Sequence, residues 1–305
     1  MEQVPHAAPP CPDPLARAPR AAARDWLRLP PPSLQGALLA LIGRDTRNAG
    51  LSSAQRLTHF PASPLVTLSW YTGVASGLVV RDELGSRWQP FGARVVISGS
   101  QSVPVTSWAA ETGRGYIACF SADAAQALFG VDLAAIQDRF LPAEQVLEAR
   151  FAPLWTALLA SEEESLMEVL EHHLAPRWQA LQGRNTAQAS LRQLGRNWVE
   201  RLAWQAHTWR RQHSERHVER RVKSFSGRSL REWQSLVKTE GLFFAARDRV
   251  EAGQTLDWAA LAQEEGFADQ AHMSRTAKRI TGFSPGEFAE RFMQDESFWV
   301  YRLWI

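Results

Sequence analysis

The feature that most constrains the fold of this chain is a stretch that occurs twice near its C-terminus, with a spacing of 55 residues between the copies at Ser214 and Asp269. In the second copy, Asp269 is a good N-cap for a helix that runs to about Thr281. Gly282 ends that helix, because glycine adopts the left-handed conformation without a steric cost. Ser214 and Gly227 occupy the same positions in the first copy. The sequence therefore predicts one helix that is built twice with equivalent caps.

Both predicted helices have an apolar row on one side and a basic row on the other. Each is followed by a capping-box pattern, at Ser229–Glu232 and at Ser284–Glu287. A short helix from Trp258, ended by Gly266, precedes the second copy. Two helices joined by a tight turn, with a basic outer face on the second, outline a DNA-binding helix-turn-helix unit. The matched positions are Val218 and Met273, Val222 and Ala277, Phe225 and Ile280 in the apolar rows, and Arg220 and Arg275, Lys223 and Lys278 in the basic rows.

The segment between the two copies, Leu230–Glu251, has a helical pattern apart from Gly241. At 1.5 Å per residue, a helix of this length spans roughly 30 Å. This is close to the length of one turn of B-DNA, about 34 Å. We therefore expect the connector to place two recognition helices in successive major grooves on one face of a duplex.

The charge, the cysteine content and the lack of long apolar runs argue against a disulfide-rich secreted protein, a zinc-binding protein and a membrane protein. The formal net charge is only +2, but basic residues are concentrated between 210 and 231, where they overlap the first copy. The two cysteines, Cys11 and Cys119, provide neither a disulfide framework nor a zinc-ligand spacing. No secretory segment and no membrane-spanning run is visible. We expect a cytoplasmic protein that uses no cofactor or metal and does not contact a membrane.

The region from His59 to Phe120 is rich in β-branched and aromatic residues separated by turn-forming ones. Short strands at this spacing favour a β-barrel or sandwich. A short apolar helix is predicted before them, at Leu34–Ile42, with a polar connection at 44–47, and another helix after them at Ala122–Phe129. The predicted strands are Leu65–Tyr71, Ser76–Val80, Arg94–Ser98 and Gly115–Phe120.

Two amphipathic helices are predicted between the β region and the DNA-binding region, at Gln145–Leu159 and Ser165–Leu181. They would form either a dimer surface or a layer packed on the β domain, and the sequence does not separate these alternatives. Gly183-Arg184-Asn185 marks a linker, and a further helix is predicted at Leu194–Trp209.

The predicted fold class is α+β, with a β-barrel or sandwich and a helical hairpin before an all-α double helix-turn-helix domain. We expect four segments along the chain. They are a disordered, proline-rich tail at 1–29, a sensor or dimerisation domain at 30–142, the helical hairpin at 143–183 and the DNA-binding domain at 190–305.

Aromatic residues of the β region are candidates for a small-molecule pocket, although each of them is also a candidate core residue. No histidine occurs between Leu65 and Phe120, so the histidine ligands of a catalytic metal site are not visible there. Gly282–Gly286 matches the nucleophile motif GxSxG, but a helix precedes it rather than a strand, which favours helix capping. We expect no enzyme and no catalytic residue. The candidate pocket residues are Trp70, Tyr71, Trp88, Trp108 and Phe120.

The stretch GFADQAHMSRTAKRITGFSPGEF resembles the C-terminal signature of the AraC/XylS transcriptional regulators, and SERHVERRVKSFSG is similar to their first recognition helix. The resemblance implies two helix-turn-helix units joined by a long helix. Upstream, RDTR, HFPASPLVTLSWY and SGSQSVPVTSW are similar to the cupin-like N-terminal region of one branch of these regulators, which implies that the β-barrel or sandwich is cupin-like.

The chain departs from the family pattern at Ala271, where serine is often found, and at Met273, where phenylalanine is common. Two further features depart from it. Ala277 stands where phenylalanine is common, and HTWRRQH at 207–213 lacks the usual glycine turn.

The resemblance implies DNA contacts through Arg216, Glu219 and Arg220 in the first unit and Gln270, His272, Ser274 and Arg275 in the second. Helical periodicity independently favours Arg216, Arg220 and Lys223, while Lys223 and Lys278 are suited to phosphates. The expected function is sequence-specific transcription regulation, controlled through the N-terminal domain by a small effector or a partner. The expected partners are double-stranded DNA, a second copy of the chain and RNA polymerase. The alternative is a protein–protein module whose helix-turn-helix units no longer bind DNA.

Overall fold

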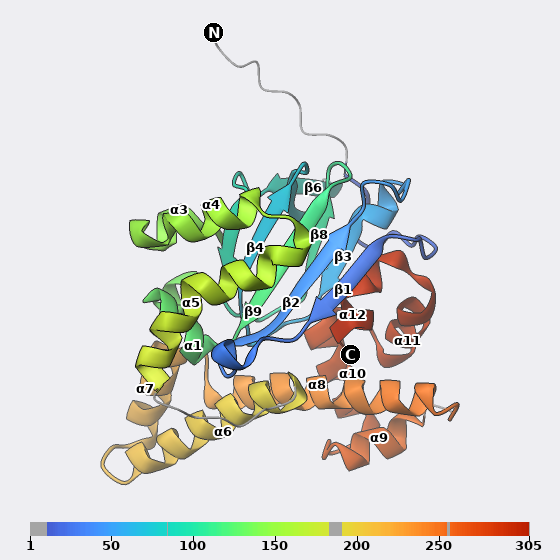
Figure 1. The fold of residues 1–305 in the computed structure, drawn as a ribbon. Helices are drawn as coiled ribbons and strands as arrows, with labels where there is room; N and C mark the ends of the chain where they lie inside the picture. Colours follow the sequence, from blue (N-terminus) through green and yellow to red (C-terminus); the bar gives the residue numbers. More distant parts are fainter. Residues whose placement is uncertain (1–10, 84, 183–190, 255–256, 305) are drawn as a thin grey trace.

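The structure, a computed structural model, describes residues 11–83, 85–182, 191–254 and 257–304. Two antiparallel sheets form its N-terminal half, and its C-terminal half is helical (Figure 1). The predicted α+β class is confirmed, with the β domain preceding an all-α region that contains two helix-turn-helix units.

The larger sheet has six strands in the order β1-β2-β9-β4-β7-β10, and the smaller has four in the order β3-β8-β5-β6. The four predicted strands correspond to β4, β5, β7 and β9, with ends that differ by no more than two residues. The bounds are β1 Arg24–Arg28, β2 Leu38–Asp45, β3 Leu57–Phe60, β4 Val66–Thr72, β5 Ser76–Asp82, β6 Gly85–Pro90, β7 Val95–Ser98, β8 Val105–Ala109, β9 Arg114–Phe120 and β10 Phe140–Pro142.

The helix predicted at Leu34–Ile42 is wrong. Only the 3-10 turn η1, Pro32–Leu34, is helical, and most of the segment belongs to β2. This strand lies between β1 and β9, and every residue from Leu38 to Arg44 is buried. A strand covered on both faces is a continuous apolar run, and its hydrophobic pattern does not differ from that of a buried helix. Arg44 and Asp45, predicted in a polar connection, also lie in β2.

The predicted disordered tail at 1–29 also requires correction. Residues 1–10 lie outside the described residues, but Arg24–Arg28 forms β1, which pairs with β2 so that Trp26 lies opposite Gly43. Upstream, the Ala18 carbonyl oxygen accepts a hydrogen bond of 2.9 Å from the Glu296 amide. The short edge strand has only a weak apolar pattern, and its partners lie far away in the sequence.

Helices cover the outer face of the large sheet, where α4 and α5 cross in front of its strands (Figure 1). Leu154 and Leu158 of α4 and Leu170 and Leu174 of α5 are buried in one core with Trp70. Of the two roles considered for the helical hairpin, packing on the β domain is therefore present in the structure, and dimerisation stays a prediction. The helices of this layer are α1 Ala122–Phe129, α2 Leu133–Ile136, α3 Ala143–Val146, α4 Ala152–Ala160 and α5 Leu166–Gln182, with 3-10 turns η3 Ala149–Phe151 and η4 Glu163–Ser165.

The helix predicted at Gln145–Leu159 is divided, because Leu147 has an extended backbone between α3 and η3. The helix at Ala122–Phe129 is confirmed as α1, and Gly130, with φ 71°, ends it. The linker predicted at 183–185 lies outside the described residues.

The C-terminal half is built around α8, which runs beneath the β domain in Figure 1 and spans the predicted connector. No described helix combines the length and the apolar content that are needed to cross a bilayer. The bounds are α6 Leu191–Arg210, α7 Glu215–Ser226, α8 Leu230–Glu251, α9 Trp258–Glu264, α10 Gln270–Thr281, α11 Pro285–Gln294, η5 Glu296–Phe298 and α12 Trp299–Trp304.

The first helix-turn-helix unit shares its core with the β domain. Val218, Val222 and Trp233 belong to the same buried cluster as Trp70 and Phe120. Most of the second unit packs in another cluster, which contains Met273, Ala277 and several aromatic side chains, whereas Ile280 of α10 belongs to the first cluster. The β domain is therefore in direct packing contact with the first unit.

Candidate nucleic-acid interface and effector cavity

Helix α7 has the caps and the two faces that its sequence predicts. The Ser214 hydroxyl accepts a hydrogen bond of 3.4 Å from the His217 amide, and Gly227 ends the helix with φ 82°. Val218 and Val222 are 2% and 1% exposed on the inner side. The side chain of Phe225 lies outside the part of the chain whose side chains are described. The predicted DNA contacts of α7 are all exposed: Arg216, Glu219, Arg220 and Lys223.

Helix α10 repeats this arrangement 55 residues later. The Asp269 carboxylate accepts a hydrogen bond of 2.6 Å from the His272 amide, and Gly282 ends the helix with φ 87°. Met273 and Ala277 are completely buried. The inner and outer faces therefore match those of α7. The predicted contacts Gln270, His272, Arg275 and Lys278 are exposed, and Ser274 is half-buried.

Aromatic side chains from α11 and the C-terminal segment fill the space beside Ala277. Phe283, Phe288, Phe298 and Tyr301 belong to its cluster, and the rings of Phe288 and Tyr301 lie 4.9 Å apart, edge to face. Phe298 lies after the signature in the sequence but belongs to the same buried cluster as Ala277. The second unit therefore has a packed core although position 277 holds an alanine.

The GxSxG match at 282–286 has a structural role. The Ser284 hydroxyl accepts a hydrogen bond of 3.4 Å from the Glu287 amide and caps α11, and helix α10 precedes it. In hydrolases with this motif, a strand rather than a helix precedes the nucleophile.

The turn between α6 and α7 forms without a glycine. The Arg211 and His213 amides donate hydrogen bonds of 3.2 and 3.0 Å to the carbonyl oxygens of Thr208 and Trp209. The Arg221 guanidinium lies 4.4 Å from the centre of the Trp209 ring, and this cation–π contact links α7 to α6. The missing glycine therefore does not prevent the helix-turn-helix geometry.

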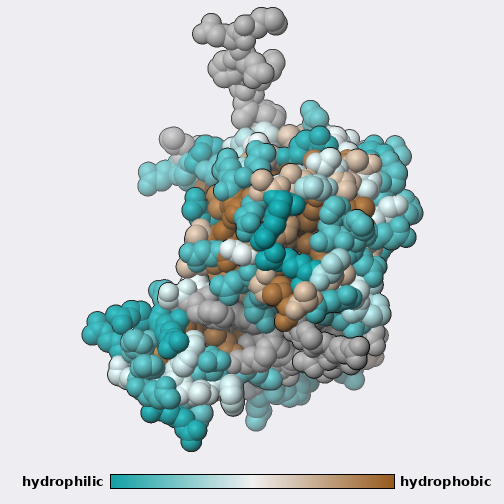
Figure 2. Space-filling view, turned by 60° about the vertical axis from the view of Figure 1, so that its left-hand side comes forward, coloured by the Kyte–Doolittle hydropathy of each residue, from teal (hydrophilic) through white to brown (hydrophobic). Residues whose placement is uncertain are grey.

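The two helices α7 and α10 both contact one continuous connecting helix. Helix α8 has 22 residues, so its length is about 33 Å at 1.5 Å per residue. It contacts α7 as well as α10. Among the coloured residues of Figure 2, those at the lower left of the molecule are mostly hydrophilic.

Both units also contact the β domain at the C-terminal ends of their recognition helices. After α7, the buried Arg228 guanidinium lies 3.2 Å from the Asp138 carboxylate. At the end of α10, the Ile280 carbonyl oxygen accepts a hydrogen bond of 2.7 Å from the Ala62 amide. The sequence offered no signal for either contact, because the partners are 90 and 218 positions apart (280 − 62 = 218). The β domain thus constrains the position of each unit.

A cavity of about 130 Å³ lies where the two sheets meet the helical domain. Its walls include Leu236 of α8, Ile280 of α10 and Tyr301 of α12, together with residues from both sheets. Within the described part of the chain, its lining residues carry no charge. The cavity therefore touches the connector, the second recognition helix and the C-terminal helix at once.

Of the five predicted pocket residues, Tyr71 lines this cavity and the other four do not. Trp70 and Phe120 are completely buried in the core beneath α4 and α5, whereas Trp88 and Trp108 pack together on the small sheet. Neighbouring residues of a strand point to opposite faces, so Tyr71 faces the cavity and Trp70 faces away from it. The sequence shows that Trp70 and Tyr71 lie on opposite faces of the strand. It does not show which of the two faces is covered by helices. The cavity residues missed by sequence analysis include Thr67, Ser69, Ile117 and Cys119.

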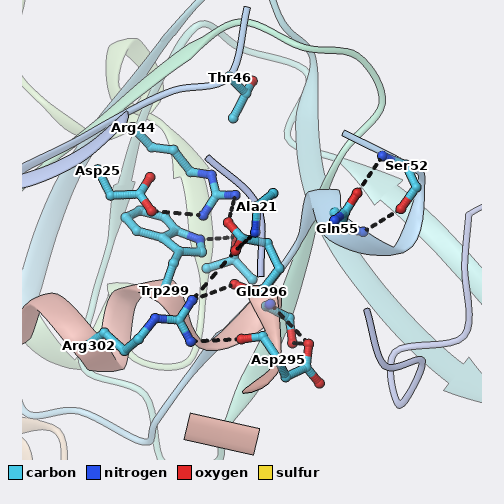
Figure 3. Close-up of polar contacts among 12 residues, drawn as sticks. Ala21, Asp25, Arg44, Thr46, Ser52, Gln55, Asp295, Glu296, Trp299 and Arg302 are labelled. Atoms are coloured by element: carbon cyan, nitrogen blue, oxygen red, sulfur yellow. Dashed lines mark hydrogen bonds and ion pairs between the residues drawn. The ribbon is translucent and has the colours of Figure 1, made fainter. Parts of the chain in front are cut away.

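A buried cluster of charges joins β1 and β2 to the C-terminal segment (Figure 3). The Arg44 guanidinium donates a hydrogen bond of 2.7 Å to Glu296 and lies 3.5 Å from the Asp25 carboxylate. The Glu296 carboxylate also accepts a hydrogen bond of 2.8 Å from the Ala21 amide and lies 3.7 Å from Arg302. Arg44 and Glu296 are 8% and 1% exposed.

Burial raises the pKa of Asp25 to about 6, against the opposing effect of Arg44 and with a smaller contribution from Glu296. The ordinary pKa is 3.8, so the folded state holds its proton more tightly than the unfolded state, and this contribution to stability is lost as the pH rises from about 4 to 6. We expect Asp25→Asn to raise the free energy of unfolding by about 1–3 kcal/mol at pH 7.5 and by much less at pH 4.5. Urea unfolding at both pH values measures this. An equal effect at the two pH values would contradict the ionisation argument.

No protein-family model matches the sequence, and no curated protein matches it significantly. Among solved structures, the chain is similar to ToxT from Vibrio cholerae. The structure of ToxT from strain O395 bound to (E)-4-(8-methylnaphthalen-1-yl)but-3-enoic acid aligns with a TM-score of 0.36 and 9% identity, covering 88% of this chain and 98% of that one. Wild-type ToxT from strain SCE256 bound to an unsaturated fatty acid aligns with a TM-score of 0.32 and 9% identity, covering 78% and 94%.

The sequence signature and the structure agree on the organisation of the chain. A β domain precedes two helix-turn-helix units, which are joined by α8 and have equivalent caps. This is the order of parts that the resemblance of the sequence to AraC/XylS regulators implies.

Proposed function

We propose that the chain regulates transcription in the cytoplasm by binding a specific double-stranded DNA sequence, under the control of a small effector of its N-terminal domain. The observation that carries this proposal is the repetition of an N-capped helix, α7 and α10, with an exposed basic and polar face in both copies. In helical hairpins with only a structural role, packing would explain a repeated buried apolar row, but it would not explain a repeated exposed basic row.

The exposed side chains suit different parts of the DNA. Arginine pairs bidentately with guanine and glutamine with adenine, which assigns base contacts to Arg216, Arg220, Gln270 and Arg275. Lysine carries a compact charge that suits a phosphate group. We therefore assign phosphate contacts to Lys223 and Lys278, and these contacts add affinity without selecting a base sequence. Glu219, His272 and Ser274 complete the proposed contact surface.

Binding to a promoter fragment at several salt concentrations tests this function against the protein–protein alternative. DNA binding through phosphates releases counterions, so the logarithm of the affinity falls linearly with the logarithm of the salt concentration. A steep slope together with preference for one fragment supports the proposal. Absence of binding at 50 mM salt, for protein shown to be folded, would favour the protein–protein module.

Arg275→Ala should weaken binding to the specific site by about 1–3 kcal/mol, because a bidentate base contact is lost, and should relax the preference at one base pair. Fluorescence anisotropy with the site and with its single-base variants measures both effects. Arg279→Ala is the matched control, because Arg279 lies on the same helix but donates a hydrogen bond of 2.6 Å to Ser235. An equal loss on random DNA would contradict the base-contact assignment.

The position of the cavity supports regulation by a small ligand. A ligand there would touch Leu236 and Ile280, which belong to the connector and the second recognition helix. It would favour whichever arrangement of the DNA-binding units it binds more tightly, and DNA would change the affinity for the ligand by the same factor. A homodimer and an RNA polymerase contact belong to the same proposal.

A further inference from the structure

Helix α8 passes through two buried clusters. Trp233 and Leu236 of its first half belong to the cluster that also contains the core of the β domain. Leu242 and Phe244 of its second half belong to the cluster that contains most of the second helix-turn-helix unit. Gly241 lies between them, and glycine weakens a helix interior because it loses more conformational freedom on folding than other residues. The connector is therefore weakest where it passes from one cluster to the other.

The β domain holds the first unit through Asp138. Its carboxylate lies 3.2 Å from the guanidinium of Arg228, which is 2% exposed. Among the described residues, Asp138 alone combines a side chain with a left-handed backbone, with φ 55°, and such a conformation persists where surrounding contacts hold it. The Asp138 amide donates a hydrogen bond of 2.9 Å to the Ser100 carbonyl oxygen, and the Ser102 hydroxyl donates one of 2.9 Å to the carboxylate. Asp138 therefore joins Arg228 to the loop between β7 and β8.

The same loop reaches the second unit through Gln101. Gln101 and Ser63 form an isolated antiparallel pair, with hydrogen bonds of 2.9 and 3.0 Å between their amides and carbonyl oxygens. The neighbouring Ala62 amide donates the hydrogen bond of 2.7 Å to the Ile280 carbonyl oxygen. Polar contacts and short pieces of backbone thus connect Arg228 to Ile280 through the β domain. We call Asp138 and residues 100–102 and 62–63 the interdomain bridge.

The interdomain bridge meets both recognition helices at their C-terminal ends. Arg228 lies two positions after the last residue of α7, and Ile280 is the penultimate residue of α10. A recognition helix contacts base edges mainly through its N-terminal residues. The exposed side chains of Arg216 and Gln270 lie in the first turns of the two helices. The bridge therefore holds both helices without covering the ends that would enter the grooves.

The relative position of two recognition helices decides which DNA sites they can bind together. Successive major grooves on one face of B-DNA lie about 34 Å apart, with about 10 base pairs in each turn. One inserted base pair therefore moves the second half-site by about 3.4 Å and rotates it by about 35° around the DNA axis. Two helices that are held rigidly cannot follow this change, whereas two helices on a flexible connector can.

We propose that the interdomain bridge fixes α7 relative to α10 and thereby makes the chain select one spacing between its two half-sites, with Asp138 as the positioning residue. The inference rests on the proposed DNA-binding function, and it concerns the two helix-turn-helix units of one chain rather than two subunits of a dimer. The β domain then contributes to DNA specificity from the ends of the helices that lie opposite the proposed base contacts.

Selection from a randomised duplex library tests this inference on the full-length chain. The original chain and Asp138→Gly are each bound to the library, and sequencing gives the spacing between the two enriched half-sites. Glycine accepts the left-handed backbone, so this substitution removes the carboxylate without adding strain. We expect one predominant spacing for the original chain and several neighbouring spacings for Asp138→Gly.

Duplexes made from the enriched site, with and without one inserted base pair, give the size of the effect by fluorescence anisotropy. The insertion should weaken binding to the original chain about 10-fold or more, because it separates at least one side chain from its base. In Asp138→Gly the same insertion should weaken binding about 3-fold or less, because the two units can change their relative orientation. A simple loss of stability would lower both affinities and leave their ratio unchanged.

Two further variants separate the ion pair from other effects. Asp138→Asn tolerates the left-handed backbone and keeps a hydrogen-bond acceptor but removes the charge opposite Arg228, so its ratio should be intermediate. It also decides the test if the melting temperature shows that Asp138→Gly does not fold. Asp132→Asn is the matched control, because the Asp132 carboxylate lies in the same segment and accepts its hydrogen bond of 3.0 Å from Ala134 within α2. Its ratio should equal that of the original chain.

The possible outcomes distinguish this inference from the proposed function. Unchanged ratios in both Asp138 variants, or a broad range of spacings or single half-sites enriched by the original chain, would overturn the inference and leave the proposed function standing. A folded Asp138→Gly variant that binds no site would also overturn it, because the bridge would then be required for binding rather than for spacing. If the original chain enriched no sequence, the proposed function would fail, and this inference would fail with it.

Discussion

Glu296→Gln should lower the free energy of unfolding by about 3–5 kcal/mol at pH 7.5, because it leaves a buried arginine without its closest counter-charge. Arg44 is 8% exposed, and its guanidinium donates a hydrogen bond of 2.7 Å to Glu296 (Figure 3). After the substitution, the remaining carboxylate is Asp25, at 3.5 Å. Glutamine preserves the volume, so the loss reports on charge rather than packing. Chemical denaturation measures the change.

The control for this prediction is Glu290→Gln. Glu290 forms an ion pair of 2.7 Å with Arg17, but both side chains are about half exposed, at 51% and 50%. An exposed pair of this kind contributes about 0–1 kcal/mol. The double substitution Arg44→Met with Glu296→Met should recover much of the loss, because a buried pair that is replaced by apolar side chains leaves no unpaired charge. A loss of less than 1 kcal/mol in Glu296→Gln would contradict the structural role of this cluster.

Phe298→Ala should cost about 3–5 kcal/mol of stability, since it removes a completely buried aromatic ring and leaves a cavity. Phe298 joins two parts of the molecule. Its ring centre lies 5.2 Å from Phe283 and 5.4 Å from Phe288 of the second unit, and 5.4 Å from His59 of β3. The substitution should therefore weaken both the second unit and its contact with the β domain.

Urea unfolding measures this loss, and binding to the specific DNA measures its effect on function. We expect weaker binding, with the loss larger than in Met293→Ala, whose side chain is 52% exposed in the same region. A fall in the midpoint with an unchanged m-value would show that stability changed rather than the compactness of the unfolded state. Stability within 1 kcal/mol of the original chain would show that Ala277 and its neighbours do not depend on Phe298 for their packing.

The recognition helices could be predicted closely from the sequence because their determinants are local. Ser214 and Asp269 cap amides three residues ahead, and Gly227 and Gly282 supply the left-handed turn at the other end. Burial of Val218 and Met273 follows from helical periodicity, which also places Arg220 and Arg275 on the exposed side.

The β domain was predicted less completely, because its strands depend on distant partners. β2 was taken for a helix, since a strand covered on both faces lacks the alternation that identifies a half-buried one. Four of the five candidate pocket residues do not line the cavity, for a related reason. Period-two alternation separates Trp70 from Tyr71, but only the packing of α4 and α5 decides that Trp70 lies in the core.

By itself, the sequence determined the paired helix-turn-helix units, since their caps and faces arise within about 12 residues of chain. Only the tertiary structure decided how these units meet the β domain. Arg44 and Glu296 are separated by 252 positions, and the Ile280 carbonyl oxygen accepts its hydrogen bond from the Ala62 amide, 218 positions earlier in the chain. Helix caps are local interactions, whereas a buried ion pair or a cavity exists only after the chain has brought distant segments together.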